Sequence, residues 1–440
     1  MRKPRTRLIH AAVIGCTLCA LSPFGIAQEA EHHESLRERS QMFGDWGGAR
    51  TVLAQRGIIV DLQATQFYQG VTDGSADDNW KYGLKSDLFV TLLGEKLGLW
   101  KGLIVNMHLE GRAGDDVNAL TGLSPANSAM LMPNSDDTVA ITQLIAIQML
   151  RDEVGVLVGK LNAYDFVDMV FHTGRGVDGF MNASLMLPIG LGGTLGLGLP
   201  LAFLAKFKGK EVQGFAGVYD PNSCATTTCL DPLLADGAAY AAFWKFYTGI
   251  GPEGARAGYI SIGGTYSDKQ YTVVDRQSVA VIPGEGLVLT ETDTSWSIFS
   301  VVNQQLWADP SNTNRDLNFR GMYTITDGKA NPIAWSATAA LEMTGLIPRR
   351  DKDVIGIGYF HTELSSDFKG TVGPLLSAAA TLNNRALTRI TIEDTDGFEA
   401  YYKAQITPWV AVTGDVQVIT ETLSTEDTKV VAGVRTKVTF

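Results

Sequence analysis

Polar and ionisable side chains recur at every second position in several parts of this chain. His108, Glu110 and Arg112 are each separated by one residue, and Glu399 and Tyr401 have the same spacing. Alternate residues of an extended strand share one face, so this spacing predicts rows of hydrogen-bonding groups along strands. Such rows make strong hydrogen bonds to polar solutes, and they also suit the wall of a water-filled pore.

Residues of the same kind occupy other segments. The long stretch from Asn162 to Gly196 also carries charges, and it would narrow a pore if it folded inward. A solvated external loop is the alternative interpretation of that stretch. The candidate solute-contacting residues are His108, Glu110, Arg112, Asp165, His172, Arg175, Arg320, Glu342, His361, Glu399, Tyr401, Lys403 and Arg435.

Catalytic and metal sites are weaker interpretations of the sequence. Serine is abundant, but no Gly-x-Ser-x-Gly elbow accompanies the histidines, so we expect no enzyme, although barrel catalysis need not show that motif. His32, His33 and Glu34 lack a further ligand at metal-binding spacing. The acidic clusters at 73–78 and 393–397 do not match the EF-hand pattern for Ca²⁺, and we expect solvated external loops there. We predict no metal and no cofactor.

The last segment, Lys429 to Phe440, shows the alternation most simply. It reads KVVAGVRTKVTF, with apolar residues on one face and mostly basic or small residues on the other. This pattern is typical of a strand between lipid and water, but one such strand also fits a soluble sandwich. The interpretation therefore depends on repetition. Sixteen segments of this kind follow one another: 58–69, 82–93, 103–112, 141–150, 154–161, 197–208, 212–219, 238–248, 256–267, 295–307, 317–326, 333–344, 354–363, 398–407, 410–420 and 429–440.

The connections between these segments alternate in length. Long connections such as Leu364 to Gly397 follow odd-numbered segments, and short turns such as Pro408-Trp409 follow even-numbered ones. This alternation is typical of an outer-membrane barrel with both chain ends in the periplasm. We predict an all-β fold, a transmembrane antiparallel β-barrel of about 16 strands. Cys224 and Cys229 then lie in an external loop, and we predict a disulfide between them.

The first residues have the character of an export signal. A basic start, an apolar stretch and small residues before Gln28 predict a signal peptide at 1–27, with a lipoprotein box at Cys16 as the less favoured alternative. We expect 28–56 to form a short periplasmic segment and 57–440 to form the barrel. Removal of four basic residues leaves 32 Lys+Arg against 47 Asp+Glu, a net charge of −15, which argues against nucleic acid as a partner.

Four further motifs stand out in order along the chain: FGDWGGAR with LAQRGI at 43–58, VGKL with DF at 158–166, GLIPRRDKD with GIGY at 345–359, and YYKAQITPW at 401–409. Together they resemble the carbohydrate-selective porins of the OprB family, over nearly all of the predicted mature chain. The resemblance implies a sixteen-stranded channel in the bacterial outer membrane for passive uptake of glucose and related sugars. The segment 268–294 matches no part of the family pattern that we can place.

Sugars are neutral and rich in hydroxyl groups, so the charged candidates would bind them by hydrogen bonds, and Tyr401 would stack on a sugar ring. The expected partners are mono- or disaccharides, outer-membrane lipid and, through Phe440, the barrel-assembly machinery. The barrel would act as a monomer or a homotrimer. A porin for carboxylates or aromatic acids is the main alternative, and a soluble periplasmic sugar-binding protein is a further one.

Overall fold

The structure is a computed structural model. It describes residues 35–74, 80–133, 138–191, 197–207, 210–222, 224, 226–229, 233–251, 256–273, 279–282, 286–289, 291–292, 294–312, 314–384 and 389–440. The predicted signal peptide at 1–27 and the trio His32, His33 and Glu34 lie outside these residues, so both stay sequence predictions.

Sixteen antiparallel strands form one closed barrel, which confirms the predicted fold class. Each strand pairs with its neighbours in chain order, and the first strand pairs with the last. The barrel strands are β1 (Ile58–Asp73), β2 (Lys81–Leu93), β3 (Leu103–Gly114), β4 (Thr138–Arg151), β5 (Val154–Lys160), β6 (Leu197–Phe207), β7 (Lys210–Tyr219), β8 (Ala239–Ile250), β9 (Arg256–Ser267), β14 (Ser295–Ala308), β15 (Asp316–Thr326), β16 (Ile333–Thr344), β17 (Val354–Leu364), β18 (Thr395–Thr407), β19 (Val410–Ile419) and β20 (Lys429–Thr439).

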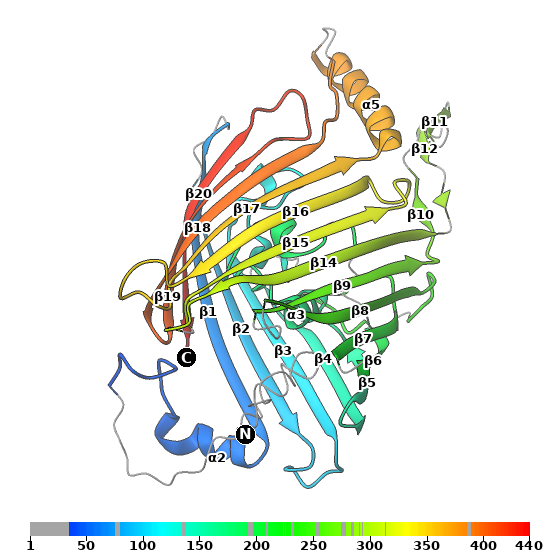
Figure 1. Cartoon of the computed structure of the whole chain (residues 1–440). Coiled ribbons are helices and arrows are strands. Elements are labelled where there is room, and N and C mark those ends of the chain that lie inside the picture. The colour runs from blue at the N-terminus through cyan, green and yellow to red at the C-terminus, as the bar shows by residue number, and fades with distance from the viewer. Residues whose placement is uncertain are drawn as a thin grey trace.

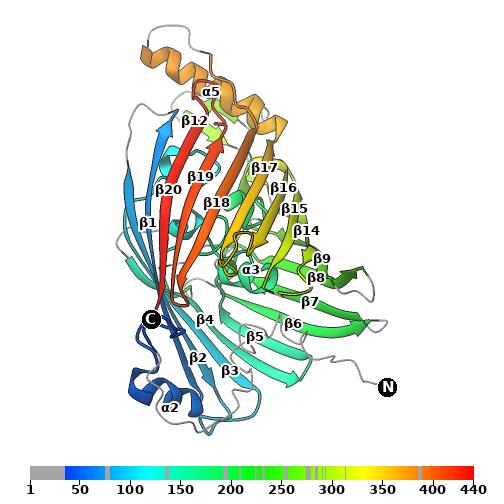
Figure 2. The same ribbon diagram turned by 60° about the vertical axis from the view of Figure 1, so that its left-hand side comes forward.

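Other elements occupy the connections. Figures 1 and 2 show α2 and the end of β20 at one end of the barrel, and α5 with β12 at the opposite end. The further elements are η2 (Trp46–Gly48), α2 (Ala49–Gln55), η3 (Asn118–Leu120), η4 (Ser128–Leu131), α3 (Ala163–Phe171), α4 (Ala183–Met186), β10 (Tyr271–Thr272), β11 (Val279–Ile282), β12 (Gly286–Leu289), β13 (Glu291–Thr292) and α5 (Ser366–Asn384). Among the described residues, no helix combines the length and apolar character needed to cross a membrane.

The two faces of the sheet differ in chemistry. Val434 on β20 is 46% exposed, whereas its neighbour Arg435 is 1% exposed and donates to the carbonyl oxygens of Gly176 and Gly179 inside the barrel. Apolar side chains therefore face outward and polar ones face the lumen, as expected for a barrel in lipid. On β20 the alternation seen in the sequence thus corresponds to the two faces of the strand in the structure.

Candidate functional site

The stretch between β5 and β6 folds into the lumen, where both views show α3 within the ring of strands (Figures 1 and 2). We call its described part, residues 161–191, the inner loop. Two asparagines begin its helices: Asn162 accepts a hydrogen bond from the Tyr164 amide at 2.9 Å, and Asn182 accepts one from the Ser184 amide at 2.9 Å. These caps satisfy amides that the first turn of a helix leaves unpaired. The two helices are therefore defined locally before the loop contacts the wall.

A cluster of buried charges joins the inner loop to β2 and β3. His108 Nδ1 lies 2.6 Å from Asp165 Oδ2 on α3, and His108 Nε2 lies 3.0 Å from Asp87 Oδ1 on β2. Arg175 Nη1 lies 3.2 Å from Asp165 Oδ1 and 3.3 Å from Asp87 Oδ1. Burial opposes the ionisation of Asp165, but His108 and Arg175 together outweigh it and lower the pKa of this carboxyl.

A second buried pair lies beside this cluster. Lys85 Nζ donates to Glu110 Oε1 at 2.5 Å and to the Met132 carbonyl at 2.6 Å. The other oxygen of Glu110 accepts from Asn162 Nδ2 at 3.0 Å. The side chain that caps α3 is therefore also bonded to the wall, so Asn162 joins the first turn of the helix to β3.

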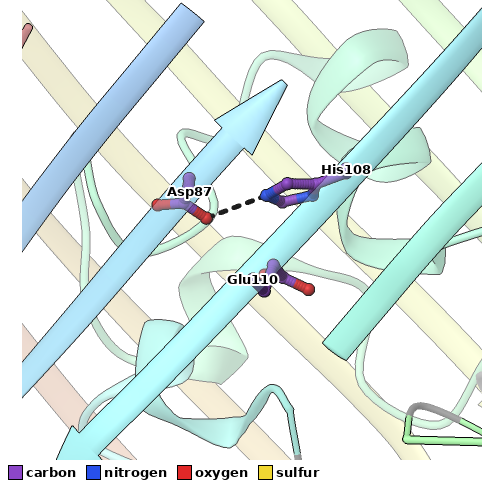
Figure 3. Close-up of side chains that lie close together, drawn as sticks. All are labelled: Asp87, His108 and Glu110. Atoms are coloured by element: carbon purple, nitrogen blue, oxygen red, sulfur yellow. Dashed lines mark hydrogen bonds and ion pairs between the residues drawn. The ribbon is translucent and has the colours of Figure 1, made fainter. Parts of the chain in front are cut away.

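Asp87, His108 and Glu110 lie close enough together to suggest a metal site (Figure 3). Carboxylates only accept hydrogen bonds, so an imidazole placed between two of them must carry both ring protons and a positive charge. His108 then has no lone pair for a metal, and Lys85 already binds Glu110. Lys85, His108 and Arg175 supply the positive charge that a metal would bring, so these residues do not fit one.

Strands β18, β19 and β20 hold the second half of the inner loop. Glu399 accepts hydrogen bonds from the Met181 amide at 2.6 Å and the Asn182 amide at 2.9 Å, and Asn182 Nδ2 donates to Gln417 Oε1 at 3.1 Å. Arg435 donates to Gly176 and Gly179 at 2.8 and 2.9 Å. Buried backbone groups of an irregular segment need such partners, so the wall provides what regular structure would provide elsewhere.

Close packing accompanies these bonds on β17. A Cβ at Gly358 would lie 2.8 Å from Leu185 Cδ1 and 3.0 Å from Phe180 Cε1. The Phe180 ring also packs edge-on against Tyr401, with ring centroids 5.0 Å apart. The glycine thus lets α4 pack closely on the wall, because a Cβ there would force the Leu185 and Phe180 side chains to shift.

Strands β15, β16 and β18 contribute a third set of contacts. Arg320 Nη1 donates to the His172 carbonyl at 3.1 Å, and Arg320 Nη2 lies 3.3 Å from Glu342 Oε2. The Tyr401 hydroxyl donates to the other oxygen of Glu342. The side chain of His172 is exposed at the C-terminal end of α3. Its confinement inside the barrel and the charge of Lys245 lower the pKa of His172, so the imidazole is neutral at pH 7.

The opposite side of α3 packs on β7, β8, β9 and β14. Phe171 belongs to a buried cluster that includes Phe215, Phe243 and Phe299. Two hydrogen bonds end the helix on the same side: Lys245 Nζ donates to Val170 O at 2.7 Å, and Tyr259 Oη donates to Phe171 O at 3.0 Å. These donors satisfy carbonyls that the last turn of a helix leaves free. The inner loop thus contacts the wall on several sides of the barrel.

Some polar groups around the inner loop stay accessible. They are Asp168, His172 and Asp178 on the loop, with Glu342 and Lys403 on the wall. Burial opposes ionisation of Asp178, but Lys437 and Lys403 outweigh it and lower the pKa of its carboxyl to about 2. Accessible groups of both signs therefore lie beside the loop.

The structure assigns different roles to the sequence candidates. His108, Glu110, Asp165, Arg175, Arg320, Glu399, Tyr401 and Arg435 bind the inner loop or one another, whereas His172, Glu342 and Lys403 keep accessible polar atoms. Arg112 pairs with Asp116, with Nη2 and Oδ2 2.6 Å apart.

His361 does not line the lumen, so that prediction is wrong. Its neighbour Tyr359 on the same face of β17 is 47% exposed, and the His361 ring packs on Trp335 with centroids 4.7 Å apart. The lumen face of β17 instead carries Gly358 and Phe360. The predicted segment ends one residue before β17 does, but its polar residues were assigned to the wrong face because polar and aromatic residues occur on both.

The candidate set lacked Lys85, Asp87 and Lys245, which bind the inner loop or the wall residues that hold it. The first two share the polar face of the second predicted strand, so the alternation contains the signal that would find them. Lys245 belongs to a segment rich in aromatic residues on both faces, where no alternation marks the lumen.

The structure also describes parts of the loops for which a disulfide and solvated acidic clusters were predicted. Cys224 and Cys229 form a disulfide within the connection from β7 to β8, with their Cα atoms 5.4 Å apart. In the acidic cluster at 393–397, Asp394 binds Lys369 at 2.8 Å and Asp396 binds His361 at 2.9 Å. Of the other acidic cluster, residues 75–78 lie outside the described residues.

Comparison with known proteins agrees with this architecture. The profile of the family described as "Carbohydrate-selective porin, OprB family" matches residues 73–440. A search of the curated proteins gives no significant match. The structure titled "High pH structure of Pseudomonas putida OprB" superposes with a TM-score of 0.75 at 20% identity, covering 92% of this chain and 99% of that one.

A second structure, titled "Low pH structure of Pseudomonas putida OprB", gives a TM-score of 0.56 at 17% identity, with the same coverage of 92% and 99%. At these identities the likeness concerns the fold. The family profile covers most of the chain, including fifteen complete barrel strands and the inner loop. This chain therefore belongs to the OprB family of carbohydrate-selective porins and is a porin of the bacterial outer membrane.

Proposed function

We propose that this porin admits glucose and related mono- and disaccharides by passive diffusion past the inner loop. The observation that carries the proposal is the mixed set of accessible groups beside that loop. Asp168, Asp178 and Glu342 accept hydrogen bonds, whereas Lys403 donates them, and the neutral His172 does both. A hydroxyl-rich solute donates and accepts equally well, so it can replace its hydration by contacts with either kind of group.

The same balance argues against a porin for carboxylates or aromatic acids. A pore selective for anions would need accessible cations without nearby carboxylates. Arg175 and Arg320 are instead buried in ion pairs with Asp87, Asp165 and Glu342. Their charges hold the inner loop and are neutralised locally, which leaves little field to attract an anion.

We infer further that permeation involves no chemical step. His108 carries both ring protons, so it cannot act as a general base. Binding groups alone are needed for diffusion. The pore would work in a monomer or in each barrel of a homotrimer, because one chain supplies both the wall and the inner loop. We also propose that Phe440 is the residue read by the barrel-assembly machinery.

Single-channel recording tests the proposed solute. The purified protein is reconstituted in planar bilayers, and conductance is measured while glucose, gluconate or glucosamine is added. These three solutes share a size but differ in charge. We expect glucose to reduce conductance in a saturable way at lower concentration than either charged analogue. Stronger block by gluconate would favour the carboxylate alternative, and conductance indifferent to all three would refute a sugar site.

A further inference from the structure

The segment that precedes β1 lies against the end of β20. The Met42 amide donates to Thr439 O at 2.8 Å, and Arg50 Nη2 on α2 donates to Phe440 O at 2.7 Å. The Phe43 ring packs on the Phe440 ring with centroids 5.3 Å apart. Three contacts of different kinds thus fall on two consecutive residues: one from a backbone amide, one from a cation and one from an aromatic ring.

Further contacts fix this segment in place. Trp409 Nε1, in the turn between β18 and β19, donates to Leu36 O at 2.7 Å. The Arg50 guanidinium lies 4.4 Å from the Trp46 ring centroid, and Asp45 accepts a hydrogen bond from the Thr51 amide at 2.8 Å. The guanidinium therefore lies on the Trp46 ring, just before α2, in the position from which it donates to Phe440 O.

These contacts lie where the barrel closes, at the pair of strands β1 and β20. Among the strands that the structure describes, β1 and β20 are the one pair of barrel neighbours that do not follow one another as barrel strands along the chain. Their register starts at Gln63 and Thr439, and the Phe440 amide then donates to Leu62 O at 2.9 Å. No connecting turn holds this pair together, so separation of the two strands has no covalent limit, unlike separation of any other pair.

We propose that residues 36–56 form a clamp that holds this seam closed by binding Thr439 and Phe440. The clamp is joined to β1 through Gly57 and is bonded to the end of β20, so it replaces the turn that the seam lacks. Arg50 has a second suitable neighbour in Asp61 on β1, which lies close enough to interact with its charge. One guanidinium is thus drawn to both strands of the seam.

Hydrogen exchange of the detergent-purified barrel tests the clamp. Arg50→Gln removes the cation that binds Phe440 O, and Arg56→Gln, at an exposed position just after α2, is the matched control. We expect exchange of the β1 and β20 amides to become about tenfold faster in Arg50→Gln, the factor that one charge-assisted hydrogen bond supplies. The β9–β14 pair serves as the internal reference and should not change.

Phe43→Ala provides an independent variant, because it removes the ring contact and leaves Arg50 in place. It should speed exchange at the same seam by a smaller factor, and it decides the question if Arg50→Gln yields no folded barrel. Unchanged seam exchange in the folded variants, or an equal increase in β9 and β14, would overturn the proposal. Single-channel conductance should stay at the wild-type value, because none of these residues touches the inner loop.

Discussion

The imidazole of His108 on β3 lies 2.6 Å from the carboxylate of Asp165 on α3, while its other nitrogen faces Asp87 on β2. One protonated ring therefore bridges two carboxylates, one on the wall and one on the inner loop, and Arg175 supplies the second positive charge that balances them. The position of the loop depends on this charge, because loss of His108 would leave two buried carboxylates with Arg175 as their remaining shared cation.

Replacing His108 by leucine should release the start of the inner loop. We expect a loss of stability of about 3 kcal/mol, since two buried carboxylates lose their shared partner. We also expect larger single-channel conductance and weaker block by glucose. His361→Leu is the matched control, because that histidine lies on the outer face, and its conductance should equal wild type. Equal effects of the two substitutions would contradict the assigned roles.

Arg435→Met should loosen the other half of the loop. The guanidinium donates to the carbonyls of Gly176 and Gly179, and a hydrogen bond to a charged group contributes about 1.5–3 kcal/mol. The expected results are a lower temperature of barrel unfolding and a noisier open channel. Lysine at this position would keep the charge but reach only one carbonyl, so Arg435→Lys should fall between methionine and wild type. An unfolding temperature unchanged in Arg435→Met would be incompatible with this role.

Substitution of an accessible residue should change binding without changing stability. His172→Ala removes an exposed side chain but keeps the carbonyl that Arg320 binds. We expect glucose block to need a several-fold higher concentration, the loss of about 1 kcal/mol of hydrogen bonding. The unfolding temperature should stay within about 1 °C of wild type, as is usual for exposed positions. A stability loss without a change in glucose block would assign His172 to the scaffold.

The pH dependence of the loop can be followed through Asp178. Lys437 and Lys403 lower the pKa of this carboxyl from 3.8 to about 2, so its contribution to stability is complete above about pH 4. The contribution is lost as the pH falls through 2, because protonation then removes the ion pair. The difference in unfolding temperature between wild type and Asp178→Asn should be constant from pH 7 to 4 and shrink below that. A difference that already shrinks near pH 6 would contradict the lowered pKa.

Much of the barrel could be predicted because lipid and water impose opposite demands on the two faces of each strand. The segments 256–267 and 333–344 agree with β9 and β16 at both ends, and the other strands differ by a few residues. Segment 268–294 was left unassigned, and it contains the short strands β10 to β13. Segment 364–397 contains α5, whose pattern is irregular because its Pro374 interrupts the helical signal.

The site was predictable only in part, since alternation gives the face of a residue but not its partner. It identified His108 and Glu110, yet the same rule applied to β17 chose His361 on the outer face. The partners of the inner loop come from strands far apart in the sequence. Glu399, for example, binds Met181 across 218 positions, and no local pattern encodes such a pairing.

The attachment of the inner loop to β3, β8, β15, β18 and β20 has a mechanical consequence. A cylinder of sixteen strands with only water inside could flatten into an ellipse under lateral pressure from the membrane, because each strand pair acts as a hinge. The hydrogen bonds and ion pairs that join the inner loop to strands on several sides of the barrel resist that flattening. The clearance available to a solute is then set by these hydrogen bonds and ion pairs inside the barrel, and it should stay the same in membranes of different lateral tension.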